Sequence, residues 1–169
     1  YGLPIWAFAG ASDAKAMDAQ AGAEAMFSII NAMLSRANLI HDVGFLEYGS
    51  TSSLEMVTMA DELVAMSRFF AGGIPVNEET LALEAIERVV SGGPGSIFLM
   101  DDHTFEHFMQ AQFLPKLLDR SRYDSWEEAG AMNFYQRCNV EAKRILSEHQ
   151  VVPKPDEVIK TINQILQAR

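Results

Sequence analysis

Two short apolar runs lie near the start of the chain, and each ends at a glycine and a group of polar residues. They read LPIWAFAG (3–10) and ANLIHDVG (37–44). Short apolar runs bounded by turn residues are typical of buried strands. Asp18 lies between these two runs, and aspartate is a residue type that commonly caps the start of a helix. An apolar stripe at helical spacing follows it: Ala19, Ala23, Met26, Ile30 and Met33. The pattern predicts the order strand–helix–strand.

The rest of the chain has mostly helical periodicity. Two S-x-x-E capping boxes, Ser52/Glu55 and Ser125/Glu128, predict the starts of a helix reaching about residue 70 and of a long later helix. Further helices are expected after Asn77, from about Thr104 and after Pro155. The expected inward stripes of three of these helices are Leu83, Ile86 and Val90; Ala131, Tyr135, Cys138, Ala142 and Ile145; and Val158, Ile162 and Ile165.

These elements predict a helix-rich α/β fold. Two or three strands cannot close an eight-stranded barrel by themselves. The chain also begins inside an apolar run and without an initiator methionine. We therefore expect a piece of a longer protein.

Composition narrows the class of protein. Apolar residues make up 49% and charged residues 21% of the 169 residues, as in globular domains. The formal net charge is −10, and the 13 Lys and Arg residues form no run, which argues against a general nucleic-acid surface. A single cysteine, Cys138, excludes an internal disulfide and suits a reducing, cytoplasmic location. No apolar stretch is long enough for a membrane span.

Polar side chains with possible chemistry gather where the two expected strands end. Loops at the ends of strands in β-α units commonly face ligands, because a rigid scaffold positions them. The alternative is that such residues only cap or form turns. The candidates are Ser12, Asp13 and Lys15 after the first strand, and His41, Asp42 and Glu47 after the second.

Other motifs favour structural roles. His103 and His107 share a helix face, but HTFEH is not the H-E-x-x-H zinc motif and no cysteine pair supports it, so we predict no metal site. GGPG (92–95) lacks the Lys-Ser/Thr of a phosphate loop and reads as a turn. Cys138 lies on an apolar stripe, which favours an inert core position.

Three motifs carry a resemblance to a known family. They are SDAK…D-x-Q-x-G…E (12–24), NLIHDVG-x-LE-x-G (38–49) and HTFEHF (103–108). With them the chain closely resembles the C-terminal part of the trimethylamine:corrinoid methyltransferase family. The resemblance implies an incomplete TIM barrel, with the last barrel strands and helices in 1–100 and C-terminal helices in 101–169.

The resemblance also implies an activity. The family moves a methyl group from a methylated amine to the cobalt of a corrinoid (cobalamin) that a separate partner protein carries, so this chain alone would bind no cofactor. Members that use trimethylamine contain pyrrolysine, whereas relatives that lack it include glycine betaine enzymes; none occurs in these residues. We expect a methanogenesis-related enzyme that forms a homo-oligomer when full length and binds neither nucleic acid nor membrane.

The chemistry favours a pocket that tolerates a cation. Methyl transfer needs nitrogen to leave as a neutral amine, and a quaternary ammonium already carries the charge that makes this easy. Such a substrate needs mainly desolvation and orientation. Aromatic faces bind such cations, although core packing is an equally good explanation for each ring. The candidate substrate-binding residues are Trp6, Phe8, Phe45 and Tyr48.

Two hypotheses follow. In the first, the chain is the catalytic C-terminal portion of a corrinoid-dependent amine methyltransferase, with Asp13, Lys15, His41, Asp42 and Glu47 as catalytic candidates. In the second, the isolated chain is a catalytically silent folded fragment that acts only in packing or partner interaction.

Overall fold

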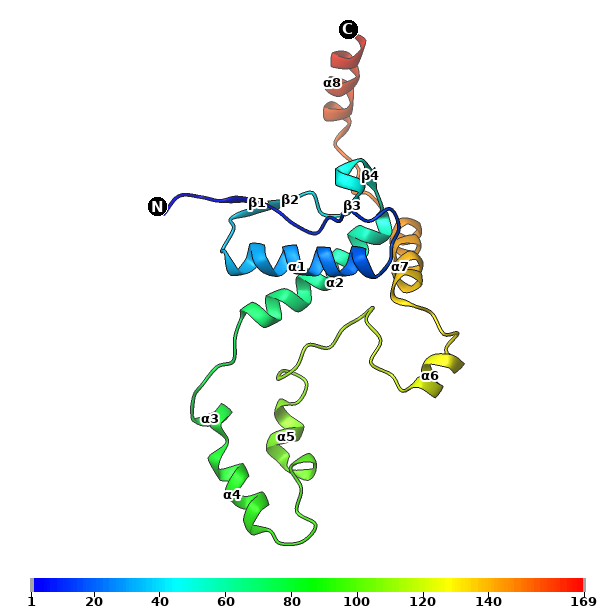
Figure 1. The fold of residues 1–169 in the computed structure, drawn as a ribbon. Helices are drawn as coiled ribbons and strands as arrows, with labels where there is room; N and C mark the ends of the chain where they lie inside the picture. The colour runs from blue at the N-terminus through cyan, green and yellow to red at the C-terminus, as the bar shows by residue number, and fades with distance from the viewer. Residues whose placement is uncertain (1, 169) are drawn as a thin grey trace.

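The computed structural model describes residues 2–168 as a small helical body with elements extending from it (Figure 1). The strands are β1 (Trp6–Phe8), β2 (Leu39–His41), β3 (Phe45–Leu46) and β4 (Thr51–Ser52). The α-helices are α1 (Ala19–Leu34), α2 (Leu54–Ala71), α3 (Glu78–Leu81), α4 (Leu83–Ser91), α5 (Asp102–His107), α6 (Tyr123–Glu128), α7 (Phe134–Glu148) and α8 (Asp156–Gln167). Two 3-10 turns are η1 (Glu47–Gly49) and η2 (Phe98–Met100).

The expected strand–helix–strand order is confirmed. β1 and β2 pair in parallel, with Trp6 opposite Leu39 and Phe8 opposite His41. Parallel neighbours need a crossover connection, which α1 provides. Side chains alternate along each strand, so Ala7 and Ile40 pack against the core while Trp6, Phe8 and His41 lie on the exposed face.

Helix α1 begins where the sequence predicts, but it buries a different row of side chains. Asp18 caps it by accepting the N–H groups of Gln20 and Ala21. The predicted stripe is wrong in register, since Ala19 and Ala23 are exposed. The helix is alanine-rich on several sides, and its smallest row is the one that meets α2, because small side chains permit close approach. The buried residues are Ala21, Ala25, Ile29 and Ala32.

Neither predicted capping box forms. Ser52 belongs to β4 and pairs with Phe45, so Ser53 caps α2 instead, accepting the N–H of Met56 at 3.2 Å. Glu55 accepts from Asn139 on α7 at 2.6 Å. Ser125 and Glu128 lie inside the short α6. The long helix α7 starts later, at a capping box made by Asn133 and Gln136, which leaves Ala131 outside it.

The core lies where α2 packs between α1 and α7. Met56, Met59 and Leu63 of α2 are buried there. Cys138 of α7 is fully buried in the same cluster, and desolvation raises the pKa of its thiol to about 11. An uncharged buried thiol is a poor nucleophile, which agrees with the inert role predicted for Cys138.

Two predicted inward stripes are exposed instead. Leu83, Ile86 and Val90 of α4 face outward, because this helix packs through Ala85 and Val89 on its other side. Helix α8 stands away from the body (Figure 1), and its stripe of Val158, Ile162 and Ile165 is 41–64% exposed. Among the helices of those residues, none is both long and apolar enough to cross a membrane.

The fold is therefore helix-rich α/β, as expected, with very little sheet. Each of the two sheets in the described part of the chain has only two strands, and they do not close into a barrel.

Gly44 fixes how closely the loop after β2 approaches α2. It has φ +93°, and a Cβ there would lie 2.2 Å from Val57 Cγ2. Gly49 also has a positive φ, +86°, but has open space around it. We expect Gly49→Ala to lower the free energy of unfolding by about 1 kcal/mol through backbone strain alone. Gly44→Ala should lower the free energy of unfolding by about 1–3 kcal/mol more than Gly49→Ala does, because steric overlap with Val57 adds to the same backbone strain.

Urea denaturation of both variants measures the difference. Equal losses would show that Val57 moves aside and that the close contact contributes nothing to stability.

Candidate functional site

The two loops that follow β1 and β2 run side by side. Backbone hydrogen bonds continue beyond the strands and join residues 9–14 to residues 41–47. The bonds are Ala9 N to His41 O (3.3 Å), Gly44 N to Gly10 O (3.0 Å), Ser12 N to Phe45 O (3.0 Å) and Glu47 N to Ala14 O (3.2 Å). The structure thus brings the two predicted groups of polar residues to one edge of the sheet.

Glu24 of α1 holds the first loop in shape. Its carboxylate accepts the Ser12 hydroxyl at 2.5 Å, the Asp13 backbone N–H at 2.8 Å and the Gln20 side-chain amide at 2.9 Å. These donors, the Ser12 hydroxyl first, lower the pKa of Glu24 below its usual 4.5. We did not select Glu24 from the sequence, although it is the final acid of the SDAK…D-x-Q-x-G…E motif.

Lys15 links the first loop to the second. Its Nζ donates to the backbone oxygen of Asp13 at 2.7 Å and lies 4.7 Å from the centre of the Tyr48 ring. This is cation–π geometry. Lys15 therefore lies over the Tyr48 ring, which was predicted to face a substrate cation.

His41 and Asp42 form a separate group with the aromatic residues of β1. His41 Nδ1 lies 3.0 Å from Asp42 Oδ2. The His41 ring meets Trp6 and Phe8 edge to face, with centroid distances of 5.4 and 6.2 Å. Asp42 has φ +66°, a left-handed conformation that aspartate tolerates better than most residues. Both side chains remain partly open to solvent.

Glu47 and Tyr48 lie in a strained turn. Glu47 (φ +49°), Tyr48 (φ +55°) and Gly49 (φ +86°) are consecutive left-handed residues, and non-glycine side chains in this region cost about 1 kcal/mol each. Thr51 donates its hydroxyl to Glu47 at 3.1 Å. Phe45 is half-buried in the β3–β4 ribbon below, so its position suits support of the turn better than substrate contact. Strain of this kind gathers at functional sites.

The predicted residues thus form two adjoining groups. The lysine group contains Asp13, Lys15, Glu47 and Tyr48, and the aromatic group contains Trp6, Phe8, His41 and Asp42. In the lysine group the Lys15 ammonium is already engaged by the Asp13 backbone oxygen and the Tyr48 ring. The aromatic group offers rings and a carboxylate on an exposed face, which is the chemistry that binds an organic cation.

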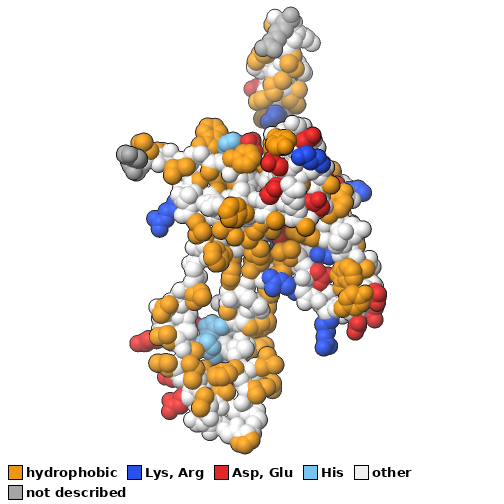
Figure 2. All heavy atoms as spheres, in the orientation of Figure 1, with side chains coloured by type: hydrophobic (Ala, Val, Ile, Leu, Met, Phe, Trp, Pro, Cys, Tyr) orange, Lys and Arg blue, Asp and Glu red, His pale blue; other side chains and the backbone are white. Residues whose placement is uncertain are grey.

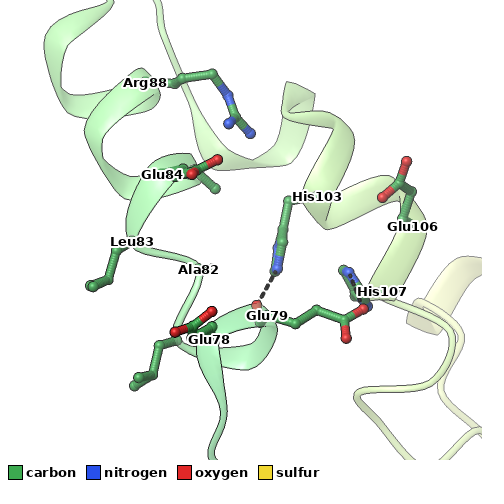
Figure 3. A pocket seen from close by; sticks show the side chains of 11 residues that line it. Glu78, Glu79, Ala82, Leu83, Glu84, Arg88, His103, Glu106 and His107 are labelled. Carbon is green, nitrogen blue, oxygen red and sulfur yellow. Dashed lines mark hydrogen bonds and ion pairs between the residues drawn. The ribbon is translucent and has the colours of Figure 1, made fainter.

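The HTFEHF motif lies elsewhere, in a hollow of about 510 Å³ between α3, α4 and α5 (Figure 3). His103 Nε2 is 3.0 Å from the Glu79 backbone oxygen, and His107 Nε2 is 3.6 Å from Glu79 Oε1. The two imidazole rings are 4.4 Å apart. Across residues 2–168 no group of three or more His, Cys, Asp or Glu side chains has the geometry to hold a metal. Through these contacts with Glu79, the two histidines join α5 to α3.

Known proteins resemble this chain along its whole length. The family model for trimethylamine methyltransferase (MTTB) matches residues 1–169. Trimethylamine methyltransferase MttB of Desulfitobacterium hafniense (strain DSM 10664 / DCB-2) is 38% identical over 167 residues, which cover 99% of this chain and 33% of the relative. MttB of Methanosarcina barkeri (strain Fusaro / DSM 804) is 35% identical over 166 residues, covering 98% and 33%.

A relative with a different named substrate also matches. Glycine betaine methyltransferase of Desulfitobacterium hafniense (strain Y51) is 34% identical over 150 residues, covering 88% of this chain and 30% of the relative. The chain therefore spans about a third of the length of the curated relatives it matches. Since the family model matches from the first residue to the last, the chain belongs to the trimethylamine methyltransferase (MTTB) family.

Proposed function

We propose that this chain forms part of the substrate site of a methyltransferase that takes a methyl group from a methylated amine. The observation that carries the proposal is the aromatic group, in which Trp6, Phe8 and His41 share the exposed face of the parallel strands beside Asp42. The substrate is a methylated ammonium, either protonated trimethylamine or a quaternary amine such as glycine betaine.

The aromatic group acts on the substrate by binding and orientation. Ring faces attract a methylated ammonium, and their apolar surface removes water from its methyl groups. Trp6 and Phe8 lie two residues apart on one strand, so the sheet fixes the spacing between their rings. Asp42 adds a carboxylate that compensates the positive charge, and its contact with His41 holds that carboxylate in place.

The acceptor in this proposal would be the corrinoid of a separate partner protein, which would supply the electron pair for the new bond to the methyl group. The electrons of the C–N bond would stay on nitrogen, so that it leaves as a neutral amine. The aromatic group lies on an exposed face, and His41 is already engaged by Asp42. An acceptor that approaches from outside the chain suits this arrangement. No residue of this chain is assigned as a cobalt ligand.

A TIM barrel is the larger frame we propose for this site. The parallel β1–β2 pair with its crossover helix is the repeating unit of such barrels, and polar side chains follow the strand ends as they do there. Further strands would then pair with β1 and β2 and complete the rim. In the alternative, the isolated chain is catalytically silent and serves packing or partner contacts.

Trp6→Leu tests the aromatic group in the full-length protein that carries this chain. Loss of one cation–π contact should raise KM for the methylated amine about threefold to about thirtyfold. A neutral tert-butyl analogue should lose less affinity than the amine, because only the apolar part of its contact with Trp6 is removed. Phe70→Leu, at an exposed aromatic near the end of α2, is the control. An unchanged KM in Trp6→Leu would remove Trp6 from the site.

Asp42→Ala tests the carboxylate. We expect turnover with the amine and the partner corrinoid protein to fall about tenfold or more, because an organic cation in a partly desolvated site loses its counter-charge. Asp61→Ala, on the exposed side of α2, is the matched control and should leave turnover unchanged. Normal turnover in Asp42→Ala would make Asp42 a turn-forming residue only.

Glu24→Gln tests the positioning of the first loop. The folded state lowers the pKa of Glu24, so its ionised form stabilises the fold above pH 4.5, and this contribution disappears as the pH falls through the lowered pKa. Glutamine keeps the shape but loses the charge. We expect the variant to be less stable than wild type near neutral pH and to lose less stability on acidification.

Urea denaturation from about pH 7 to about pH 3 measures this difference. If the two curves stay parallel across that range, Glu24 does not hold the Ser12–Asp13 turn through its charge.

A further inference from the structure

The strand that carries the aromatic group has little backbone pairing to hold it. β1 has three residues and, within residues 2–168, pairs only with β2. Its Trp6 and Phe8 side chains are 69% and 55% exposed. Figure 2 shows hydrophobic side chains and a histidine gathered where Figure 1 draws these two strands. A pair of strands this short is marginally stable, so its register needs support from elsewhere.

Asn38 holds the start of β1. Its Oδ1 accepts the Ile5 N–H at 2.9 Å, and its own backbone N–H donates to the Ile5 oxygen at 2.9 Å. The Leu39 N–H, the first of β2, donates to that same oxygen at 3.3 Å. The side-chain oxygen of Asn38 thus takes the place of the strand carbonyl that would accept the Ile5 N–H if the parallel ladder continued. This pair of bonds fixes Ile5, and with it Trp6, against the start of β2.

Ser28 of α1 holds the other end of the same strand. Its Oγ accepts the Gly10 N–H at 3.1 Å. The hydroxyl proton points to the backbone oxygens of Glu24 and Ala25, at 2.9 and 3.0 Å, which leaves a lone pair of the oxygen for Gly10. Ser28 and Phe8 also line one hollow of about 370 Å³ between α1 and β1. The helix therefore fixes the chain two residues after Phe8.

The geometry of the aromatic group depends on the register of β1. His41 lies opposite Phe8, and its ring contacts the rings of both Trp6 and Phe8. A slip of one residue would turn Trp6 and Phe8 away from the exposed face, and a slip of two would remove His41 from its place opposite Phe8. Asn38 opposes sliding of β1 along β2, and Ser28 opposes sliding of β1 along α1.

We propose that Asn38 and Ser28 are positioning residues for the binding of the methylated ammonium, an inference that rests on the proposed function. Neither residue touches the substrate. They hold β1 at its two ends, so that Trp6 and Phe8 keep the spacing that fits the cation. Each contributes one acceptor oxygen to β1, and among residues 2–168 the side-chain NH2 of Asn38 donates no hydrogen bond. Asn38→Asp and Ser28→Thr therefore keep the oxygen that acts, whereas alanine at either position removes it.

Asn38→Ala and Ser28→Ala test the proposal in the full-length protein that carries this chain. Each should raise KM for the methylated amine about twofold to about tenfold, the effect of one lost hydrogen bond, and should change kcat much less. Asn38→Asp and Ser28→Thr should keep a KM close to that of the wild type. Asn38→Ala should raise KM less when Trp6 is already leucine, because Asn38 acts through Trp6.

Two matched variants serve as controls. Ser147 is exposed on α7 and makes the same local bond as Ser28, from its hydroxyl to the backbone oxygen three residues before it, at 2.9 Å. Asn163 is exposed on α8. Ser147→Ala and Asn163→Ala should both leave KM unchanged.

The NMR signals of the His41 ring give a second measurement, which needs no substrate. The rings of Trp6 and Phe8 displace these signals from their values in an unfolded chain, because His41 contacts both rings. In the 169-residue chain the displacement should shrink in the two alanine variants and persist in Asn38→Asp and Ser28→Thr. Circular dichroism identifies a variant that does not fold, in which case the variant of the other residue carries the test.

Two results would overturn the proposal. One is unchanged His41 signals in both alanine variants, and the other is an unchanged KM in both while Trp6→Leu raises KM. An unchanged KM in Trp6→Leu would instead overturn the proposed function, and the His41 signals would still decide whether Asn38 and Ser28 hold the strand in register.

Discussion

The pairing of two three-residue strands determines where every candidate group lies. β1 and β2 are short, but their hydrogen bonding continues through the following loops as far as Ala14 and Glu47. A parallel pair places the ends of both strands at the same edge, so residues about thirty positions apart become neighbours. The small side chains on the buried face of α1 let that helix pack closely on α2 beneath the strands. Without this support so short a sheet would be marginal.

The two groups at this edge differ in where their cation comes from. In the lysine group the cation belongs to the chain itself, since Lys15 covers Tyr48 and bonds to the backbone of Asp13. In the aromatic group the rings and Asp42 have no lysine or arginine bound to them among the described residues. An external cation is therefore better matched to the aromatic group. The left-handed turn at Glu47 and Tyr48 separates the loop end from β4 and adds local strain.

The sequence predicted the local chemistry better than the packing. The strand ends, the Asp18 cap and the buried Cys138 follow from residue type and spacing, and all three are confirmed. The row of α1 that is buried could not be read from an alanine-rich helix, because several rows look equally apolar. From the sequence, the N-cap of α2 was placed at Ser52, one residue too early. Ser52 and Ser53 are the same residue type, and only the strand pairing of Ser52 distinguishes them. Glu24 was missed because its three partners come together only after folding.

The burial of Cys138 gives the chain an internal reporter. Its sulfur lies in the cluster shared by α2 and α7, and its raised pKa keeps it in the unreactive thiol form. A thiol reagent reaches it only when α7 moves away from α2. The labelling rate, divided by the rate for an unfolded peptide, therefore gives the equilibrium constant for that opening. Because the chain has no second cysteine, this chemistry follows the separation of one helix from its neighbour without any substitution.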